Sequence, residues 1–239
     1  MVTGATSGIG AATARRLARD GAAVAVLGRR DDRLKELAYE IEGHALPVVV
    51  DVTDRAAMER VAPLIREDLG RVDVVVANAG VMLPAPYEEA AVEEWESMIA
   101  TNVNGVLYTG RAFAADLLAA AAEGRPADLV HVGSIGGHNV FPNYAVYGAT
   151  KAAVAHLTRN LRTEFGPRGV RVRTIEPGLV ATELGEDMRD EAQREHLARW
   201  RADVPPLESE DIADVIAYTV AAPARMNVAR VEVLPTRQG

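Results

Sequence analysis

Cysteine is absent from this 239-residue chain, and its absence excludes disulfides, thiolate nucleophiles and metal sites built on thiolates. No run of about 18 consecutive apolar residues occurs, so no segment could span a bilayer as a helix. The opening residues Met1-Val2-Thr3-Gly4 lead at once into a polar, glycine-rich stretch, unlike a secretory signal. We therefore expect a cytoplasmic protein without a metal site and without a membrane partner.

Basic residues are fewer than acidic residues in this sequence. The chain carries 26 Lys and Arg against 34 Asp and Glu, and the formal net charge of −8 disfavours binding to nucleic acid or to an anionic membrane. Hydrophobic residues make up 49% and charged residues 25%, a globular composition that excludes disorder. Proline, glycine and serine nowhere gather into a linker, so we expect one domain over residues 1–239.

Short apolar runs alternate with longer segments of helical period. The runs are β-branched and nearly continuous, as in strands that are buried on both faces. They comprise Ala23–Leu27, Leu46–Val50, Val72–Ala77, Leu129–Val132, Val170–Ile175 and Val231–Leu234. The helical segments are Ile9–Asp20, Asp32–Glu42, Arg55–Leu69, Val92–Ala122, Tyr144–Phe165 and Asp211–Ala222. This alternation predicts an α/β fold: a single-domain, Rossmann-like, doubly wound parallel sheet with helices on both faces.

Glycines follow five of the predicted helices, at the position where a left-handed cap commonly ends a helix. These glycines are Gly21, Gly43, Gly70, Gly124 and Gly166. A charged segment over residues 179–206, containing Met188 and Trp200, interrupts the alternation after a predicted strand. Open α/β sheets bind ligands at the carboxyl ends of their strands, so we interpret this segment as a substrate lid. A surface helical excursion is the alternative.

A glycine-rich turn, Thr3-Gly4-Ala5-Thr6-Ser7-Gly8-Ile9-Gly10, leads directly into the first helical segment. Its glycines let the backbone turn tightly, and the free N–H groups at a helix start favour a phosphate. The turn therefore predicts a dinucleotide site, with an ordinary tight turn as the alternative. Only Met1–Thr3 precede it, which is short for a central strand, so we expect the natural start to lie upstream.

The second predicted strand ends in Gly28-Arg29-Arg30, where NAD-binding proteins of this fold carry an acidic residue for the ribose hydroxyls. Guanidinium groups pair with a 2′-phosphate, which predicts NADP(H), with Arg29 as the better-placed contact. Two arginines that open a solvated helix are the alternative. Asp51 and Val52 close the third strand, where the Asp51 carboxylate either meets the adenine amino group or helps cap the next helix.

Tyr147 and Lys151 lie four residues apart on one helical face. A free tyrosine titrates near pH ~10, and a neighbouring cation lowers that pKa toward the range of a general acid/base. Ser134, upstream at the end of a strand, can hold a carbonyl oxygen that Tyr147 protonates. The alternative is an ordinary surface pair and an unrelated turn serine.

Together these elements resemble the short-chain dehydrogenase/reductase family over essentially the whole chain. The matching elements, in the family's order, are Thr3–Gly10, Asn78-Ala79-Gly80, Asn102, Ser134, Tyr147 with Lys151, and Pro177-Gly178 followed by Thr182. An NADP-dependent subgroup that includes clavulanate (clavaldehyde) dehydrogenases and serine/3-hydroxy-acid dehydrogenases is similar at residues 175–178, 182–184 and 234–238. Ala77 departs from the asparagine that many relatives have there.

The resemblance implies a catalytic set of Asn102, Ser134, Tyr147 and Lys151. Tyr147 would be the acid/base, Lys151 would lower its pKa and hold the nicotinamide ribose, Ser134 would orient the substrate oxygen, and Asn102 would anchor a water relay. With the motifs above, the expected cofactor-binding residues are Gly4, Thr6, Ser7, Gly8, Ile9, Gly10, Arg29, Arg30, Asp51, Val52, Asn78, Ala79, Gly80, Tyr147, Lys151, Pro177, Gly178 and Thr182.

The expected function is NADP(H)-dependent interconversion of a carbonyl (aldehyde or ketone) and an alcohol, both small molecules. A non-catalytic dinucleotide-binding protein that senses redox state is the alternative, which the complete catalytic set disfavours. By position, the substrate should lie among Ile135, His138, Phe141, Tyr144, Leu179 and the loop after Leu184.

Several polar residues near this pocket have two interpretations. His138 could donate to an acidic or hydroxylated substrate or could simply be solvated. Arginines of the lid could attract a carboxylate-bearing aldehyde or pair with the lid's own acids; they are Arg189, Arg194, Arg199 and Arg201. Small apolar residues in Ala112–Ala122 and Tyr144–Phe165 either pack on the sheet or join subunits, and the resemblance implies a homodimer or homotetramer.

Overall fold

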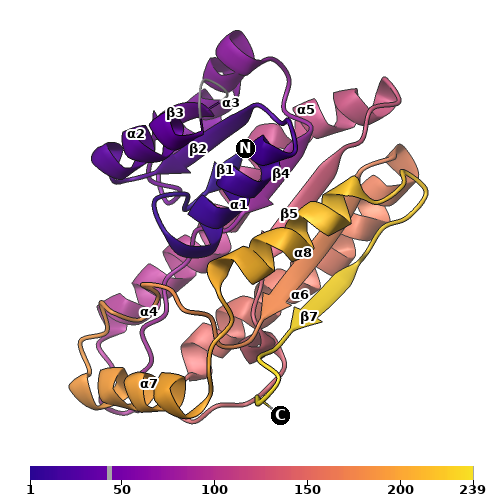
Figure 1. The fold of residues 1–239 in the computed structure, drawn as a ribbon. Helices are drawn as coiled ribbons and strands as arrows, with labels where there is room; N and C mark the ends of the chain where they lie inside the picture. Colours follow the sequence, from indigo (N-terminus) through magenta and orange to yellow (C-terminus); the bar gives the residue numbers. More distant parts are fainter. Residues whose placement is uncertain (42–44, 239) are drawn as a thin grey trace.

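The computed structural model describes residues 1–41 and 45–238. Within these residues seven strands form one parallel sheet in the order β3-β2-β1-β4-β5-β6-β7 (Figure 1). The strands are β1 (Val2–Thr3), β2 (Val24–Gly28), β3 (Ala45–Val49), β4 (Val74–Ala77), β5 (Asp128–Val132), β6 (Arg171–Pro177) and β7 (Arg230–Val233). The predicted α/β class is confirmed, with strand bounds within a few residues of those expected.

Eight α-helices connect the strands over the described ranges. They are α1 (Gly8–Arg19), α2 (Asp31–Glu40), α3 (Arg55–Leu69), α4 (Val92–Ile99), α5 (Gly105–Ala122), α6 (Ala145–Phe165), α7 (Glu191–Asp203) and α8 (Ser209–Ala221). The single helical segment expected over residues 92–122 contains a π-helical stretch, Ala100–Asn104, between α4 and α5. Such a stretch widens a helix locally and is common at functional sites.

Successive side chains of a strand point to opposite faces of the sheet, so alternate residues contact different layers of helices. Val24 and Val26 of β2 pack with α1, α2 and α8, whereas Ala25 and Leu27 pack with α3 and α5. The helical side chains of the first layer include Ala14, Leu17, Leu34, Ile212 and Ile216. Those of the second layer include Met58, Ile65, Phe113 and Leu117. The sheet is therefore covered on both faces, as the near-continuous apolar strands predict.

Three of the predicted glycine caps have the positive φ that favours glycine, although a ψ of −170° takes Gly70 out of the left-handed helical region. Their φ angles are 95°, 81° and 76° at Gly21, Gly70 and Gly124. The prediction for Gly166 was wrong: its φ is −56°, and the chain continues into a short 3₁₀ turn that ends at Gly169, whose φ is 83°. Gly43, and Glu42 at the end of its helix, lie outside the described residues.

The short strand β1 lies at the centre of the sheet. Val2 pairs with Val26 of β2 and with Val76 of β4. The strand order reverses direction between β1 and β4, which opens a crevice beyond the carboxyl ends of the strands. No helix in the described part of the chain is long and apolar enough to cross a bilayer. The cytoplasmic location stays a prediction.

Candidate functional site

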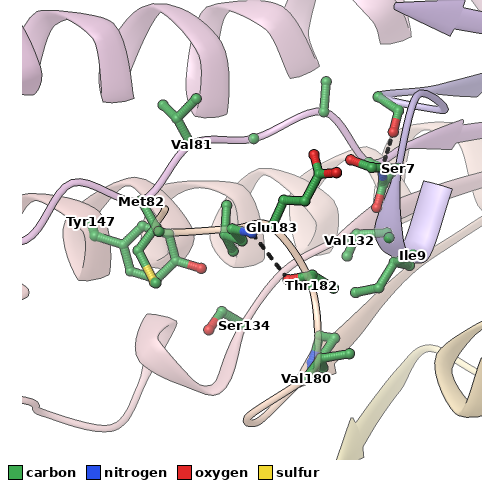
Figure 2. Close-up of a pocket in the computed structure, with 18 of the residues that line it drawn as sticks. Ser7, Ile9, Val81, Met82, Val132, Ser134, Tyr147, Val180, Thr182 and Glu183 are labelled. Carbon is green, nitrogen blue, oxygen red and sulfur yellow. Dashed lines mark hydrogen bonds between the residues drawn. The ribbon is translucent and has the colours of Figure 1, made fainter. Parts of the chain in front are cut away.

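One cavity of about 380 Å³ lies at the carboxyl ends of the strands and collects nearly all predicted site residues (Figure 2). The predicted residues that line it are Gly4, Thr6, Ser7, Gly8, Ile9, Arg29, Arg30, Asp51, Val52, Asn78, Ala79, Gly80, Ser134, Tyr147, Lys151, Pro177, Gly178 and Thr182. In the described structure Gly10 and Asn102 do not line the cavity. They lie behind its wall, where they contact Gly4 and Val81.

The glycine turn needs its glycines for two different reasons. Gly4 and Gly8 have φ angles of 64° and 52°, a backbone region that side chains with a Cβ rarely adopt. A Cβ on Gly10 would overlap the Gly4 carbonyl oxygen, so Gly10 supports the turn from behind. Ser7 precedes α1 without capping it by a side-chain hydrogen bond, which leaves the first N–H groups of α1 for a ligand. The turn fits the phosphates of a dinucleotide.

Asn78 connects the end of β4 to the glycine turn. Its Nδ2 donates to the carbonyl oxygen of Thr3 at 3.0 Å, and its backbone N–H donates to Thr3 Oγ1 at 3.0 Å. Ala79 N also donates to Thr3 Oγ1, at 3.1 Å. These bonds hold Asn78-Ala79-Gly80 beside the turn, where the tripeptide forms one wall of the cavity.

At the end of β2 the geometry favours Arg30 over the expected Arg29. The Arg30 guanidinium turns toward the glycine turn: its Nε lies 3.0 Å from Thr6 Oγ1 and its Nη2 lies 2.9 Å from Ser7 Oγ. Arg29 also borders the cavity, but it is exposed. Arg30 is the arginine that the turn's hydroxyls hold, and which of the two arginines contacts a 2′-phosphate stays a prediction.

The two interpretations of Asp51 separate in the structure. Asp54, not Asp51, caps α3, and its Oδ1 accepts from Ala57 N at 2.9 Å. Asp51 accepts from Thr53 N at 2.9 Å in a local turn and remains on the cavity wall. Its carboxylate therefore stays available to a ligand.

Asn102 belongs to the π-helical stretch and supports the catalytic end of the cavity. Its Oδ1 accepts from Val81 N at 2.8 Å, and its Nδ2 donates to Val81 O at 2.9 Å and to Thr150 Oγ1 at 3.1 Å. The space where a Cβ of Gly80 would stand lies 3.3 Å from Asn102 Oδ1 and 3.7 Å from Lys151 Nζ. A glycine at position 80 therefore lets Asn102 and Lys151 approach one another.

Lys151 and Ser134 line the cavity together with Tyr147. Lys151 Nζ donates to Val132 O at 3.1 Å and lies 5.8 Å from the centre of the Tyr147 ring. Burial lowers the pKa of Lys151 to about 8. Ser134 Oγ accepts from Gly136 N at 3.0 Å, and the residue lines the cavity.

The pKa of Tyr147 differs from the expectation. Burial raises it to about 12, while the hydrogen bond with Ser134 works in the opposite direction. Lys151 does not lower it here, because Nζ is itself desolvated and donates to a backbone carbonyl instead. The prediction that Lys151 lowers this pKa therefore fails for the protein without a ligand, since desolvation is the larger effect.

The substrate end of the cavity is lined by Ile135, Phe141, Tyr144 and Leu179, as expected. His138 is not on the wall in the described structure: its Nε2 lies 3.0 Å from Glu232, at the edge strand β7.

Over this end lies the segment of residues 179–206, which carries α7. Trp200 of α7 packs on Phe141, with ring centres 5.7 Å apart.

The four arginines expected in residues 179–206 make different contacts. Arg199 lies 3.5 Å from Glu195 of the same helix, as the salt-bridge interpretation expects, whereas Arg189 lies 3.8 Å from Glu94 of α4, outside residues 179–206. Arg194 donates to backbone carbonyls of the lid. Arg201 instead borders the cavity.

Within residues 1–41 and 45–238, two buried hydrogen-bond donors on residues of the substrate end have no acceptor. Arg201 Nη2 bonds to Thr182 O at 3.0 Å, while its Nε is buried and lacks an acceptor in the part of the chain that the structure describes. The buried hydroxyl of Tyr144 also lacks a partner there.

Sequence reasoning missed three side chains of the site. Arg33 and Glu183 lie beside Arg30, where Arg33 Nη1 is 2.5 Å from Glu183 Oε1. Gln238 reaches back from the end of the chain, and its Oε1 accepts from Leu179 N at 2.8 Å. The position of Arg33 one helical turn beyond Arg30 was a usable signal. Glu183 and Gln238 stand in the stretches 182–184 and 234–238 that resemble the NADP-dependent subgroup, but no role was predicted for either residue.

Comparison with known proteins identifies relatives along the whole chain. Sulfoacetaldehyde reductase 2 from Chromohalobacter salexigens is 40% identical over 243 aligned residues, covering 100% of this chain and 94% of that protein. The NADP-dependent 3-hydroxy acid dehydrogenase YdfG from Salmonella typhi is 36% identical, covering 100% and 95%. The closed form of serine dehydrogenase complexed with NADP⁺ superposes with a TM-score of 0.92 at 34% identity, covering 100% and 95%.

The relatives agree with the family that the motifs resemble. The likeness to clavulanate dehydrogenases stays a prediction. Residues 1–193 match the family described as short chain dehydrogenase. With these relatives and the sheet described above, the chain belongs to the short-chain dehydrogenase/reductase family of oxidoreductases.

Proposed function

We propose that Tyr147 is the general acid/base of an NADP(H)-dependent oxidoreductase that interconverts a carbonyl compound and an alcohol. The single observation that carries this proposal is the convergence of Tyr147, Ser134 and Lys151 with the glycine turn on one cavity. The family acts on alcohol and carbonyl groups, and relatives named as NADP-dependent or complexed with NADP⁺ share the whole chain length.

Each catalytic side chain has a defined part in the reaction. The cofactor, when bound, supplies or accepts the hydride. In reduction, the Ser134 hydroxyl holds the substrate oxygen, and Tyr147 donates a proton to it as it becomes an alcohol. Tyr147 is protonated at neutral pH because its pKa is about 12, so it is ready to act as the acid. Lys151, whose pKa is about 8, can exchange protons near neutrality and replace the one that leaves.

The cofactor is NADP(H), and its groups fit separate parts of the cavity. The turn at Gly4–Gly10 and the start of α1 would hold the phosphates. The Arg30 guanidinium would hold the 2′-phosphate, for which a planar fork of N–H donors is suited. Asn78-Ala79-Gly80, Pro177-Gly178 and Thr182 line the path toward the catalytic end.

We propose further that the substrate carries an acidic group and that residues 179–206 act as a lid over it. Tyr144 Oη and Arg201 Nε, on residues that line this end of the cavity, are buried donors that find no acceptor among the residues described, and such donors are costly unless a ligand accepts from them. The names of the relatives, a sulfoacetaldehyde reductase, a 3-hydroxy acid dehydrogenase and a serine dehydrogenase, all denote acidic compounds. A carboxylate or sulfonate would accept from both donors.

Replacing Tyr147 with Phe tests the catalytic proposal. NADPH oxidation with a panel of short aldehydes and keto acids should fall to background, while binding of NADPH, followed by its fluorescence, should stay within about threefold. Tyr39→Phe is the matched control, because Tyr39 is 87% exposed on α2, far from the cavity. Retained turnover in Tyr147→Phe would overturn the assignment. NADPH binding without reduction of any compound in the panel by the unaltered protein would favour the redox-sensing alternative.

We propose that the protein is a homodimer or homotetramer built on α5 and α6. Leu107 on α5 is 43% exposed, and α6 presents the exposed small residues Ala149, Ala152 and Ala153. Close contact between helices favours such small residues. Sedimentation equilibrium should give a mass of two or four times 25.5 kDa, and a single 25.5 kDa species would contradict the proposal.

A further inference from the structure

Glu183 reaches from the base of the lid to the two arginines at the end of β2. Its Oε2 accepts from Arg30 Nη1 at 2.8 Å, and its Oε1 accepts from Arg33 Nη1 at 2.5 Å. Figure 2 shows the Glu183 side chain extending across the cavity toward the turn that carries Ser7. A carboxylate of this chain therefore lies between the guanidinium group of Arg33 and that of Arg30, which the hydroxyls of the glycine turn hold.

The surroundings of the Glu183 carboxylate form a cradle for an anion. Two cations, Arg30 and Arg33, contact it, and the hydroxyls of Thr6 and Ser7 hold the other side of Arg30. Hydrogen bonds from Arg30 and Arg33 lower the pKa of Glu183 to about 2, so the group is ionised at any physiological pH. The cradle favours negative charge, and in this structure the anion comes from the protein itself.

Arg30 has too few free N–H groups to bind a second anion while it binds Glu183. A guanidinium has five N–H groups. Arg30 uses Nε on Thr6, Nη2 on Thr6 and Ser7, and Nη1 on Glu183. A two-point grip on a phosphate takes two N–H groups from one edge, and one Nη1 hydrogen remains. A phosphate therefore cannot take this edge of Arg30 while Glu183 holds it.

Charge leads to the same conclusion. Arg30 and Arg33 supply two positive charges and Glu183 one negative charge, so one positive charge remains. A phosphate monoester near neutral pH carries about 1.5 to 2 negative charges. If Glu183 stayed, the phosphate and the carboxylate would repel each other within one cradle. The Glu183 side chain is 42% exposed, so it can turn into water at little cost.

We propose that Glu183 is a cofactor-specificity residue whose carboxylate competes with the 2′-phosphate of NADP(H) for Arg30 and Arg33. The inference rests on the proposed function, in which Arg30 receives that phosphate. Glu183 weakens binding of the phosphorylated cofactor while leaving the unphosphorylated cofactor unaffected. Entry of the phosphate also breaks the contacts of Glu183 with Arg30 and Arg33. These contacts lie at the base of the lid, because Glu183 follows Thr182, whose carbonyl accepts from Arg201 of α7 at 3.0 Å.

Binding of adenosine fragments to Glu183→Gln tests the competition without relying on turnover. The probes are adenosine 2′,5′-bisphosphate, which carries the 2′-phosphate, and adenosine 5′-phosphate, which lacks it. By calorimetric titration at low salt, Glu183→Gln should bind the bisphosphate about threefold to tenfold more tightly than the unaltered protein. Its affinity for adenosine 5′-phosphate should not change. The gain should shrink at high salt, because exposed charges are screened.

Glu186→Gln is the matched control for Glu183→Gln. Glu186 is exposed in the same loop, three residues further along, and the substitution removes the same charge. It should leave both affinities unchanged, which would exclude a general field effect of the lid. Unchanged affinity of Glu183→Gln for the bisphosphate would overturn the proposal. Weaker binding would overturn it as well, and would identify Glu183 as a clasp that closes over the nucleotide.

Arg30→Gln separates this inference from the cofactor assignment. The variant should lose its preference for the bisphosphate over adenosine 5′-phosphate. If that preference survives in Arg30→Gln, the assigned 2′-phosphate site is wrong and the inference fails with it. If the preference is lost but Glu183→Gln gains no affinity, the cofactor site stands and only the competition by Glu183 is refuted.

Discussion

Tyr147 and Lys151 are both buried, with 6% and 7% of their surface exposed. Burial raises the pKa of the tyrosine to about 12 and lowers that of the lysine to about 8, because desolvation disfavours the charged form of each. Burial therefore favours the uncharged form of each group, and the uncharged Tyr147 carries the proton that it would donate. At the scale of residues, the unliganded protein therefore holds Tyr147 in the protonated form that the proposed reduction requires.

Arg201→Gln should weaken binding of acid-bearing substrates selectively. Arg201 lines the cavity and its guanidinium Nε is a buried donor, and hydrogen bonds to charged groups contribute about 1.5–3 kcal/mol. The KM for an acid-bearing aldehyde should rise about tenfold or more, with little change for a neutral aldehyde of similar size. Arg199→Gln, on the same helix but paired with Glu195, is the control. Equal effects on both aldehydes would show that Arg201 only holds the lid.

His131 should make the protein less stable in mild acid. The ring is fully buried, its Nδ1 lies 2.7 Å from Thr158 Oγ1, and burial lowers its pKa to about 4. The unfolded chain takes up a proton near pH ~6.5 that the folded protein refuses until about pH 4, so stability falls as the pH drops through that window. Between pH 7 and pH 5 the loss should be about 2 kcal/mol.

Urea unfolding at the two pH values measures this loss. His131→Gln removes the titrating group and should show a smaller drop in unfolding free energy from pH 7 to pH 5, whatever its own stability. An equal drop in both proteins would contradict the assignment, since buried carboxylates elsewhere would then account for it.

Strands β5 and β6 are joined to α8 by buried charges. Asp128 begins β5, and its Oδ2 accepts from Arg171 Nη2 at 2.7 Å, while Arg173 donates to its Oδ1. The same two arginines donate to backbone carbonyls in the last turn of α8, where a cation complements the helix dipole. At the scale of elements, this cluster fixes the end of α8 against the sheet, at the edge opposite the cavity.

Asp128→Asn should therefore be strongly destabilising. Removing one partner of a buried ion pair leaves the remaining charges uncompensated, and such changes cost about 3–5 kcal/mol. The free energy of unfolding in urea should fall by about that amount, while Asp68→Asn, at an exposed position of α3, should change it by less than about 0.5 kcal/mol. A loss below about 1 kcal/mol would show that water or relaxation compensates the arginines.

The cavity gathers residues from Gly4 to Gln238, so its formation requires the whole chain. Contributions come from the glycine turn, the ends of β2, β4, β5 and β6, the start of α6, the lid and the C-terminal tail. A ligand that bridges so many segments can bind only after they have assembled. At the scale of the molecule, cofactor binding and global stability are linked by mass action.

NADPH should consequently raise the melting temperature in one cooperative transition. At a hundred times its Kd, a ligand stabilises the folded state by about 2.7 kcal/mol, which corresponds to about 5–10 °C for a domain of this size. NADH at the same concentration should give a smaller shift, because it lacks the 2′-phosphate that Arg30 would hold. Equal shifts for the two cofactors, followed by differential scanning fluorimetry, would contradict the NADP(H) assignment.

Local chemistry in the sequence was sufficient for the fold class and for the glycine turn, Ser134 and the Tyr147–Lys151 pair, whereas the family resemblance supplied Asn78-Ala79-Gly80, Asn102, Pro177-Gly178 and Thr182. Apolar runs buried on both faces identify parallel strands, and the glycine turn, the Tyr147–Lys151 pair and Ser134 each follow an element that aims them at one edge of the sheet. In a parallel sheet the carboxyl ends of all strands meet at that edge, so the order of motifs along the chain was enough to place them together.

Only the tertiary structure determined which charged side chains pair and how far burial shifts their pKa values. Arg30 rather than Arg29 faces the turn, because Thr6 and Ser7 hold its guanidinium. Glu183 reaches those arginines, and Gln238 reaches Leu179, across more than fifty intervening residues. The pKa of Tyr147 rises rather than falls, because the packed wall removes water from it. Pattern and spacing act within an element, whereas pairing and desolvation depend on segments that only the folded chain brings together.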